Sequence, residues 1–359
     1  MATLSEERVL AVLRGVKDPE LHRDIVSLNM VKSVRIDGPV VHLQLELTTP
    51  ACPLKEQIQA DVDLALKSLP GVESVKIEWS AQVRSSRPMS GILPEVKNII
   101  AVGAGKGGVG KSTVAVLLAY GLQRSGAKVG LLDSDVYGPS IPTMTGVEGR
   151  RPGIRDNLIV PLVAGGVKIM SIGFMVDRDK PLIWRGPMAH GVIKQFLEQV
   201  DWGELDYMIV DLPPGTGDVP LTLAQEIPMT GAIVVCTPQD VALIDARRAV
   251  RMYEQLNVAC LGIVENMSYY LCPKCGHRDE LFDHGGAKSA AKDLGVPFLG
   301  EIPLNVGIRL QGDAGSPEKL FTDTPDYVTD AINKVVMNAA GQISIKSGLR
   351  AITPTLTVE

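Results

Sequence analysis

A glycine-rich segment near residue 105 has the residue types needed to bind phosphate. Gly105–Ser112 reads Gly-Lys-Gly-Gly-Val-Gly-Lys-Ser and fits the pattern G-x-x-x-x-G-K-[S/T], with an apolar run before it and a helix-length apolar segment after it. Glycines let backbone N–H groups converge on phosphate oxygens, and the N-terminus of the following helix adds positive potential. We expect Lys111 to contact the β- and γ-phosphates and the Ser112 hydroxyl to bind Mg²⁺. The segment therefore predicts a P-loop that binds and hydrolyses ATP. Its expected nucleotide-contacting residues are Gly105, Lys106, Gly107, Gly108, Val109, Gly110, Lys111, Ser112 and Thr113.

A second lysine, Lys106, stands at the start of this loop. It is either a solvated surface residue or a functional cation. In the functional case it bends toward the phosphates or reaches across a dimer to the nucleotide of a partner, as an arginine finger acts in trans. Because phosphoryl transfer benefits from a second cation at the transferred group, we predict a catalytic role for Lys106.

Two acidic segments follow apolar runs and are candidates for the metal and water sites. Asp211 ends the run Tyr207–Asp211, and we expect it to hold Mg²⁺ directly or through water, with helix capping as the alternative. The Gly215 region that follows is expected to sense the γ-phosphate. In the other segment, Asp135 is predicted to orient the attacking water, while Asp133 either assists the metal or caps the next turn.

The pair Cys272-Pro-Lys-Cys275 has the spacing of a metal or cluster ligand pair. Two thiolates supply only half of the four ligands usually needed, and the chain has no obvious second pair. A two-fold dimer would bring four thiolates to one bridging site, which suits an iron–sulfur cluster or Zn²⁺. A thioredoxin-like redox pair and two incidental cysteines remain as alternatives.

The other cysteines and the nearby histidines carry weaker signals. Cys236 and Cys260 lie in apolar runs and are expected to be small core residues. Cys52 precedes a predicted helix and is either a reactive thiol or a residue of the cap region. His277 and His284 are interpreted as ordinary surface residues.

Composition limits the class of protein. The 359 residues are 45% hydrophobic and 21% charged with a net charge of −5, which indicates a globular protein of two domains without a basic nucleic-acid surface. No run approaches 18 uninterrupted apolar residues, and the start lacks the long apolar run of a signal peptide. The odd number of cysteines, five, argues against a disulfide framework. We therefore expect a cytoplasmic protein with no membrane or nucleic-acid partner.

The pattern of the chain predicts an α/β fold in two parts. Residues 1–82 read as a small α+β domain, residues 83–95 as a linker, and residues 96–340 as the P-loop domain. The tail, 341–359, has no clear period and is compatible with disorder. In the P-loop domain, apolar strands alternate with helices, which implies a mainly parallel sheet covered by helices on both faces. The expected strand runs are Asn98–Val102, Lys128–Leu132, Val167–Ile172, Tyr207–Val210, Gly231–Cys236, Cys260–Val264 and Pro297–Leu299.

Taken together, these motifs resemble a known family. Lys106 with Gly-Gly-Val-Gly-Lys111 resembles the deviant Walker A loop of the MinD/ParA/nitrogenase iron protein class. Within that class, further motifs resemble the Mrp/ApbC iron–sulfur cluster carriers and occur in the same order. They are Asp133–Ser140, Trp184–Met188, Asp211–Asp218 and Glu265–Ser268, followed by the Cys272/Cys275 pair. Residues 1–80, with Thr48-Thr-Pro-Ala-Cys-Pro53, resemble the small N-terminal domain of bacterial members and of related assembly factors.

The resemblance implies a function and a site. It implies an ATPase, which we expect to be slow, that binds a 4Fe–4S cluster at a homodimer interface through Cys272 and Cys275 and delivers it to apoproteins. It also implies that Lys106 contacts the nucleotide across the interface and that Asn266 contacts the adenine. The implied cofactors are ATP, Mg²⁺ and the 4Fe–4S cluster, and the implied partners are a second copy, cluster donors and apo client proteins.

Three other functions are compatible with the sequence. The first is a MinD/ParA-like dimeric switch, although the chain shows only a short, glycine-broken basic stretch for membrane binding. The second is a dimeric ATPase whose cysteine pair holds a structural Zn²⁺. The third is an electron-donating reductase of the nitrogenase type, which would need a dedicated acceptor.

Overall fold

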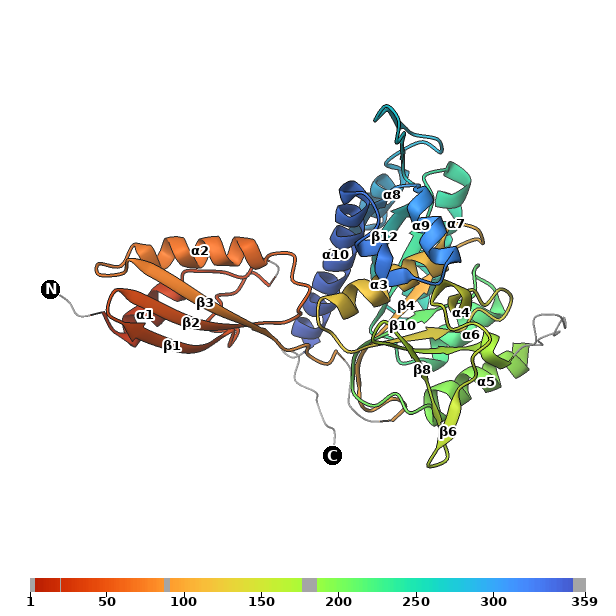
Figure 1. The fold of residues 1–359 in the computed structure, drawn as a ribbon, viewed down its shortest axis with the longest axis horizontal. Coiled ribbons are helices and arrows are strands. Elements are labelled where there is room, and N and C mark those ends of the chain that lie inside the picture. The colour runs from red at the N-terminus through yellow and green to blue at the C-terminus, as the bar shows by residue number, and fades with distance from the viewer. Residues whose placement is uncertain (1–3, 20, 87–90, 176–185, 351–359) are drawn as a thin grey trace. The chain divides into compact units, whose positions relative to one another are not determined.

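The computed structural model describes residues 4–19, 21–86, 91–175 and 186–350 (Figure 1). The chain divides into two compact units: one comprises residues up to Arg84 and those from Ser344 onward, and the other comprises Ser85–Ile343. Within the described ranges, every helix is too short or too polar to cross a lipid bilayer.

The first unit contains a three-stranded sheet and two helices. Its elements are α1 (Glu6–Leu13), β1 (Val31–Asp37), β2 (Val40–Leu47), α2 (Lys55–Lys67) and β3 (Ser74–Ala81). Strands β1 and β2 form an antiparallel hairpin, and β3 pairs with β2 in parallel after the α2 crossover, which gives the order β1-β2-β3. On β2, Val41, Leu43 and Leu45 alternate with more exposed residues and are at most 2% exposed. This period of two directs one face of the sheet into the core with Val9 and Ile58 of the helices.

The second unit is built on an eight-stranded sheet with the order β15-β12-β11-β4-β10-β5-β9-β8. All of its neighbouring pairs are parallel except β8–β9, which is antiparallel. The strands are β4 (Val96–Gly103), β5 (Val129–Asp133), β8 (Leu162–Ala164), β9 (Val167–Ser171), β10 (Leu205–Asp211), β11 (Gly231–Cys236), β12 (Cys260–Asn266) and β15 (Phe298–Ile302). Each of the seven apolar runs expected from the sequence overlaps one of these strands, with Lys128, Ile172 and Pro297 lying just outside β5, β9 and β15.

Helices flank this sheet, and most of them follow a strand directly. They are α3 (Lys111–Arg124), α4 (Ile141–Met144), α5 (Gly186–Gln199), α6 (Asp218–Glu226), α7 (Asp240–Gln255), α8 (Gly286–Leu294), α9 (Val306–Asp313) and α10 (Asp326–Arg350), with 3₁₀ turns η1 (Ile172–Met175) and η2 (Pro317–Phe321). Two small hairpins complete the unit: β6 (Gly153–Arg155) with β7 (Leu158–Val160), and β13 (Tyr270–Leu271) with β14 (Arg278–Asp279).

Strand order determines where a ligand binds. From β4 the chain crosses through α3 toward β5 on one side, whereas from β11 it crosses through α7 toward β12 on the other side. Because such crossovers are right-handed, α3 and α7 lie on opposite faces of the sheet. The neighbouring strands β4 and β11 therefore form a topological switch point, where open parallel sheets bind ligands at their carboxyl ends.

Two boundaries differ from the sequence expectation. Ser86, in the expected linker, is buried, and its hydroxyl lies 2.7 Å from that of Thr230. Residues 341–350, assigned to the tail, continue helix α10, because Ala340 and Ile343 are buried on it and extend its apolar contacts. Residues 87–90 of the linker and 351–359 of the tail lie outside the described residues.

The contact between α3 and α10 depends on a glycine. A Cβ on Gly121 of α3 would lie 2.5 Å from Cγ2 of Val336, which is buried on α10. Gly121→Ala is expected to lower the free energy of unfolding by about 1–3 kcal/mol through overpacking. Gly191→Ala is a matched control, because Gly191 is also helical and has open space at its Cβ.

Urea unfolding of both variants measures the difference, and the control should be neutral or slightly more stable. Adding Val336→Ala to Gly121→Ala should cost less than the sum of the two single changes, because the smaller side chain removes the clash. Additive costs would show that this contact is not the source of the effect.

Candidate functional site

Strand register brings the acidic candidates to one edge of the sheet. Asp211, the last residue of β10, lies opposite Val102 on β4 and opposite Asp133 on β5. Asp133 in turn lies opposite Ser171 on β9. The glycine-rich loop leaves β4 at the same edge, so segments that are far apart in the sequence meet at the carboxyl ends of adjacent strands.

The loop adopts backbone conformations that require glycine. Gly108 and Gly110 have φ angles of 82° and 81°, in the left-handed region, and Gly110 precedes the first residue of α3. Gly105 has a different constraint, since a Cβ there would lie 2.1 Å from the backbone oxygen of Asp245 on α7. The loop therefore wraps around the N-terminus of α3, whose N–H groups favour an anion.

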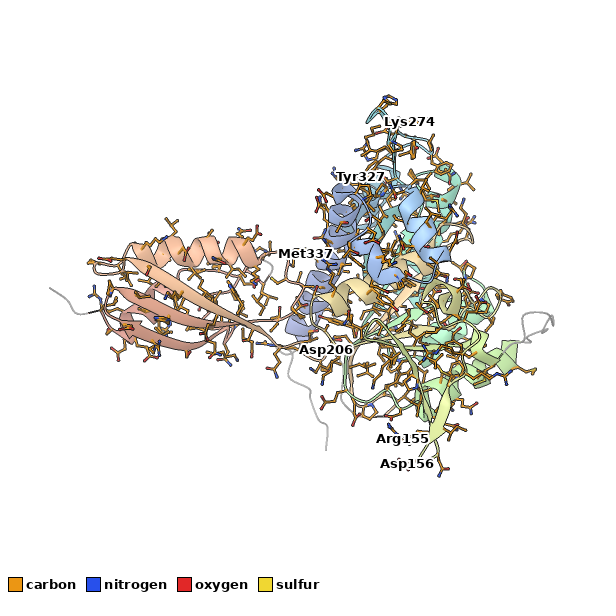
Figure 2. All side chains as sticks on the ribbon, in the orientation of Figure 1. Arg155, Asp156, Asp206, Lys274, Tyr327 and Met337 are labelled. Carbon is orange, nitrogen blue, oxygen red and sulfur yellow. The ribbon has the colours of Figure 1, made fainter. Side chains whose placement is uncertain are left out.

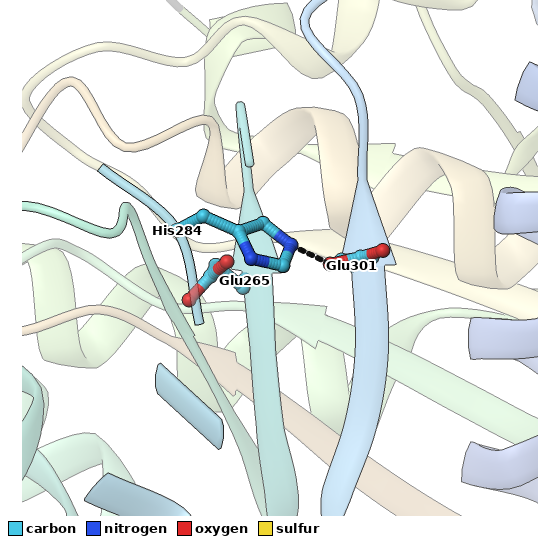
Figure 3. Close-up of side chains that lie close together, drawn as sticks. All are labelled: Glu265, His284 and Glu301. Atoms are coloured by element: carbon cyan, nitrogen blue, oxygen red, sulfur yellow. Dashed lines mark hydrogen bonds and ion pairs between the residues drawn. The ribbon is translucent and has the colours of Figure 1, made fainter. Parts of the chain in front are cut away.

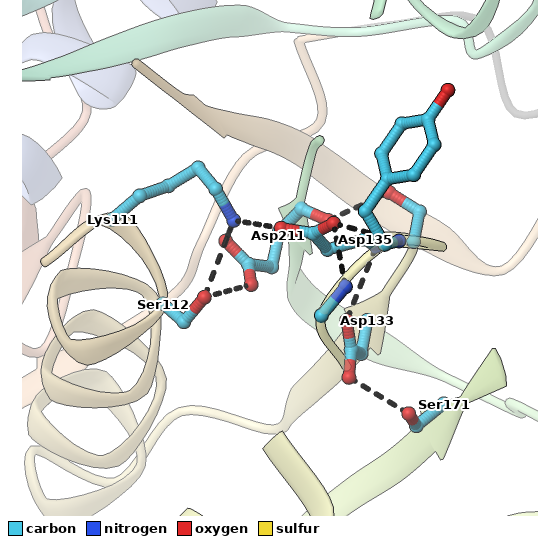
Figure 4. Close-up of polar contacts among 9 residues, drawn as sticks. Lys111, Ser112, Asp133, Asp135, Ser171 and Asp211 are labelled. Atoms are coloured by element: carbon cyan, nitrogen blue, oxygen red, sulfur yellow. Dashed lines mark hydrogen bonds and ion pairs between the residues drawn. The ribbon is translucent and has the colours of Figure 1, made fainter. Parts of the chain in front are cut away.

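Lys111 is buried at the centre of the site and pairs with two carboxylates (Figure 4). Its Nζ lies 2.6 Å from Oδ1 of Asp211 and 3.4 Å from Oδ2 of Asp135. The Ser112 hydroxyl donates to Oδ2 of Asp211 at 2.6 Å. Ser112 and Asp211 thus present adjacent oxygens, the ligands that Mg²⁺ prefers. The Lys111 ammonium lies next to these oxygens and close to the glycine-rich loop.

Asp133 and Asp135 have different surroundings. Asp133 is fully buried, accepts from the Asp135 backbone N–H at 3.2 Å, and accepts from the Ser171 hydroxyl at 2.7 Å. Asp135 accepts from the N–H groups of Tyr137 and Gly138 at 3.1 and 3.3 Å and also lines the central cavity. Asp133 therefore fixes the turn, whereas Asp135 faces the space where a ligand would lie.

Burial changes the acidity of the two strand-end carboxyls. Burial and the nearby Asp211 raise the pKa of Asp133 to about 8. Burial also raises the pKa of Asp211, although the ammonium of Lys111 and hydrogen bonds from Lys111 and Ser112 oppose the shift. The negative charge at this edge is therefore costly without cations, and Lys111 supplies one.

A cavity of about 710 Å³ opens over the loop. That volume is within the usual range for small-molecule sites. Lys106, which is half-buried, lines it together with the loop and Asn266. Its far wall comes from the segment after β15, which the sequence analysis did not identify: Pro303, Leu304, Asn305, Ile308, Arg309, Gly312 and Asp313. The sequence feature that could have identified this segment is its position directly after a parallel strand, at the edge of the sheet where ligands bind.

Asn266, the last residue of β12, contacts the loop directly. Its side-chain Nδ2 donates to the backbone oxygen of Val109 at 2.8 Å. A Cβ on Gly110 would lie only 2.1 Å from that nitrogen, so the absence of a side chain at Gly110 permits the contact. In this structure the amide holds the phosphate loop, and contact with the adenine remains a prediction.

The cysteine pair lies at the turn of the β13–β14 hairpin, around Lys274 (Figure 2). The turn is closed by backbone bonds from Cys272 N to the His277 oxygen at 2.9 Å and from Gly276 N to the Cys272 oxygen at 2.8 Å. Backbone N–H groups of Lys274 and Cys275 lower the pKa of the Cys272 thiol. Cys275 is exposed and Cys272 partly exposed. The hairpin therefore presents two thiols at the surface, and backbone N–H groups lower the pKa of one of them.

The remaining cysteines are elsewhere. Cys236 is buried on β11, Cys260 is at the start of β12, and burial raises their pKa values to about 12 and 11. Cys52 packs against the core of the first unit. None of the three lies on the β13–β14 hairpin, so the hairpin supplies two of the thiols that a four-thiolate site would need.

Two other expected segments have different outcomes. His277 is exposed, as expected, whereas His284 is partly buried with Nε2 2.7 Å from Oε2 of Glu301. Of the segment Trp184–Met188, residues 184 and 185 lie outside the described residues, and Met188 is exposed.

Comparisons with known proteins agree with this architecture. The family model for the NUBPL iron-transfer P-loop NTPases matches residues 95–341, and the model for an iron–sulfur cluster assembly protein matches residues 6–79. An iron–sulfur cluster carrier protein of Synechocystis is 49% identical over 350 residues, which cover 95% of this chain and 99% of the relative.

Two solved structures share the fold of the second unit. A nucleotide-binding protein of Archaeoglobus fulgidus, in complex with ADP, is 41% identical with a TM-score of 0.59 over 68% of this chain and 95% of its own. The cell-division ATPase MinD of Pyrococcus furiosus is 22% identical with a TM-score of 0.50 over 67% of this chain and 97% of its own. The second unit has the MinD/ParA fold expected from the sequence, and the chain belongs to the family of NUBPL iron-transfer P-loop NTPases.

Proposed function

We propose that this protein is an ATP-hydrolysing carrier that holds a 4Fe–4S cluster between two copies of the chain and delivers it to apoproteins. The observation that carries the proposal is the surface hairpin with Cys272 and Cys275. The exposed Cys275 and the partly exposed Cys272 leave half of a cluster's ligands unfilled, and a two-fold axis that relates two hairpins would supply the other half.

The relatives support this assignment. The Synechocystis relative is named an iron–sulfur cluster carrier protein, and the matching family is described as iron-transfer NTPases. The Archaeoglobus fulgidus structure is described as containing cobalt as well as ADP, so a related protein holds both a nucleotide and a transition metal.

In the nucleotide part of the proposal, Lys111 exchanges its carboxylate partners for the phosphates of ATP. With ATP bound, Lys111 leaves Asp211 and Asp135 for the β- and γ-phosphates. Ser112 and Asp211 would hold Mg²⁺, which would supply positive charge to the phosphate oxygens. Asp135 then orients the attacking water. Lys106, at the mouth of the loop, contacts the nucleotide of the partner and stabilises the charge on the transferred phosphoryl group.

A short structural path supports coupling between nucleotide and cargo. Asn266 holds the loop through Val109, and the hairpin begins only four residues later, at Tyr270. Between them, Ser268 is fixed by its backbone N–H to the Ile302 oxygen at 3.0 Å. A movement of the loop on nucleotide binding would therefore be transmitted through β12 to the two thiols.

A dimeric ATPase with a Zn²⁺-bridged cysteine pair is the second candidate. The observation in its favour is the turn itself, because two N–H groups on one thiolate and a glycine with a φ of 71° after the second cysteine also suit a zinc site.

The cargo can be tested by anaerobic reconstitution with iron and sulfide. The wild type should hold four irons and four sulfides per dimer, with a visible iron–sulfur absorption, and Cys272→Ser/Cys275→Ser should lose both. Cys52→Ser is the control, because that thiol is in the other unit. Zinc without a stable chromophore after anaerobic isolation would favour the second candidate, and a cluster retained in the double variant would exclude this site.

Hydrolysis can be tested by separating binding from chemistry. Asp135→Asn keeps an oxygen for the two backbone donors but removes the charge, so ATP should still bind while the turnover rate falls by about 10²-fold or more. Lys111→Ala should also weaken nucleotide binding. Phosphate release and fluorescent-nucleotide titration measure the two quantities, with the exposed Lys128→Ala as control. A normal rate in Asp135→Asn would assign the water-orienting role elsewhere.

Coupling can be tested at the contact between strand and loop. Asn266→Ala removes the bond to Val109 and should leave the iron content of the dimer unchanged while abolishing the effect of ATP on cluster transfer to an apo-ferredoxin. Asn338→Ala is a control that removes another amide-to-backbone bond, to Leu299, away from the loop. If transfer by Asn266→Ala still responds fully to ATP, β12 does not carry the signal.

A further inference from the structure

A second group of potential metal ligands comes from the segments on either side of the cysteine hairpin and from the neighbouring strand β15. Figure 3 shows its three side chains, Glu265, His284 and Glu301. Glu265 near the end of β12 and Glu301 on β15 are opposite one another in the parallel register. His284, just before α8, has Nε2 2.7 Å from Oε2 of Glu301. One ligand atom of each residue lies within 4.8 Å of the other two.

Glu265 is buried and held rigidly. Its Oε1 lies 2.5 Å from the Ser268 hydroxyl and 3.1 Å from the Gly285 N–H, and its Oε2 accepts from the Ala287 N–H at 2.8 Å. These bonds cap the N-terminus of α8, which is a structural role. They also leave one acceptor position on Oε2, because each carboxylate oxygen has two lone pairs. Carboxylates that bind metals are commonly oriented by such donors.

The charges of the group favour a cation. Two carboxylates face each other, and His284 compensates for one of them only when it is protonated. On the other side of the imidazole, Nδ1 lies 3.8 Å from Oε1 of Glu280, a third carboxylate. The Arg278 side chain contacts other groups: its Nε lies 3.7 Å from Oε1 of Glu280, and its guanidinium lies over the Tyr269 ring at 4.0 Å. A divalent ion would neutralise both Glu265 and Glu301.

We propose that Glu265, His284 and Glu301 form a binding site for one divalent first-row transition ion per chain. An imidazole nitrogen with two carboxylate oxygens suits Zn²⁺, Fe²⁺, Co²⁺ or Mn²⁺ better than Ca²⁺ or Mg²⁺, which take oxygen ligands. The ion takes the place of the proton between His284 and Glu301. Bond lengths of about 2.0–2.2 Å place neighbouring ligand atoms roughly 3.0–3.4 Å apart. Nε2 of His284 and Oε2 of Glu301, now 2.7 Å apart, must therefore separate while both approach Glu265, which their partly exposed side chains permit.

The site has a consequence for the hairpin. The segment between β12 and α8 carries both the cysteine pair and His284, and Glu301 belongs to the neighbouring strand. An ion bound to all three residues would therefore link the part of this segment that follows the hairpin to strand β15. The site uses no cysteine, so it does not depend on the proposed cluster or on the dimer.

Metal binding can be measured without interference from the two thiols of the hairpin. Tag-free Cys272→Ser/Cys275→Ser protein, in a large excess of Mg²⁺ to saturate hard-ion sites, is titrated with Co²⁺ by calorimetry. One Co²⁺ should bind per chain, and His284→Ala or Glu301→Gln should each weaken binding by at least about tenfold. His277→Ala and Asp279→Asn change exposed residues of the same segment outside the group and should have no effect.

A second readout follows the hairpin. In the Cys272→Ser/Cys275→Ser protein, Co²⁺ should slow tryptic cleavage after the exposed Lys274, and adding His284→Ala should abolish this protection. Circular dichroism and nucleotide binding establish that each variant is folded. The proposal is wrong if the Cys272→Ser/Cys275→Ser protein binds no Co²⁺, or if binding and protection are unchanged in both His284→Ala and Glu301→Gln.

Discussion

The buried ion pair between Lys111 and Asp211 is the interaction on which the nucleotide site depends. A charge removed from water is costly, and an unpaired one would be more so, which explains why the lysine has carboxylates at 2.6 and 3.4 Å. The same pair makes the site responsive to a ligand that carries both phosphate and a cation. In the proposed reaction, phosphate and Mg²⁺ would bring the opposite charges that each partner needs. A ligand that carries both could then separate Lys111 from Asp211 without leaving either charge uncompensated.

Strand β12 links this pair to the rest of the second unit. Successive side chains on a strand point to opposite faces, and Glu265 and Asn266 follow that rule in their contacts. Asn266 binds the loop through Val109, whereas Glu265 holds the N-terminus of α8 through Gly285 and Ala287. One strand end therefore fixes the position of the phosphate loop and the base of the cysteine hairpin together.

Much of this arrangement could be predicted because it follows from local signals. The glycine pattern from Gly105 to Ser112 indicates the loop, and continuous apolar runs that end in Asp133 and Asp211 indicate parallel strands with acids at their carboxyl ends. Strand alternation with helices also predicted the fold class. The seven runs needed only hydrophobicity and length to be recognised.

Features that depend on tertiary contacts could not be predicted in this way. The cavity wall from Pro303 to Asp313 has no motif, and its role arises only because β15 lies at the same edge as the loop. The extension of α10 through residues 341–350 was missed because Gly341 and scattered polar residues obscure its period, while buried contacts at Ala340 and Ile343 maintain the helix. His284 looked like a surface residue because Glu301, 17 positions away, becomes its neighbour only through strand pairing.

Because each hairpin supplies only two cluster ligands, the affinity of the proposed carrier for its cluster depends on how two chains are arranged. If one chain supplied all four ligands, release of a cluster would require breaking a closed site. With two thiols on each of two exposed hairpins, the cluster's affinity depends on the distance and angle between two chains. Any change of dimer geometry by nucleotide then alters cluster affinity, and a coupling of about 1–3 kcal/mol, typical of allosteric systems, would change it by roughly 5–150-fold. A carrier needs such a range, because it must hold its cargo in one nucleotide state and release it to a client in another.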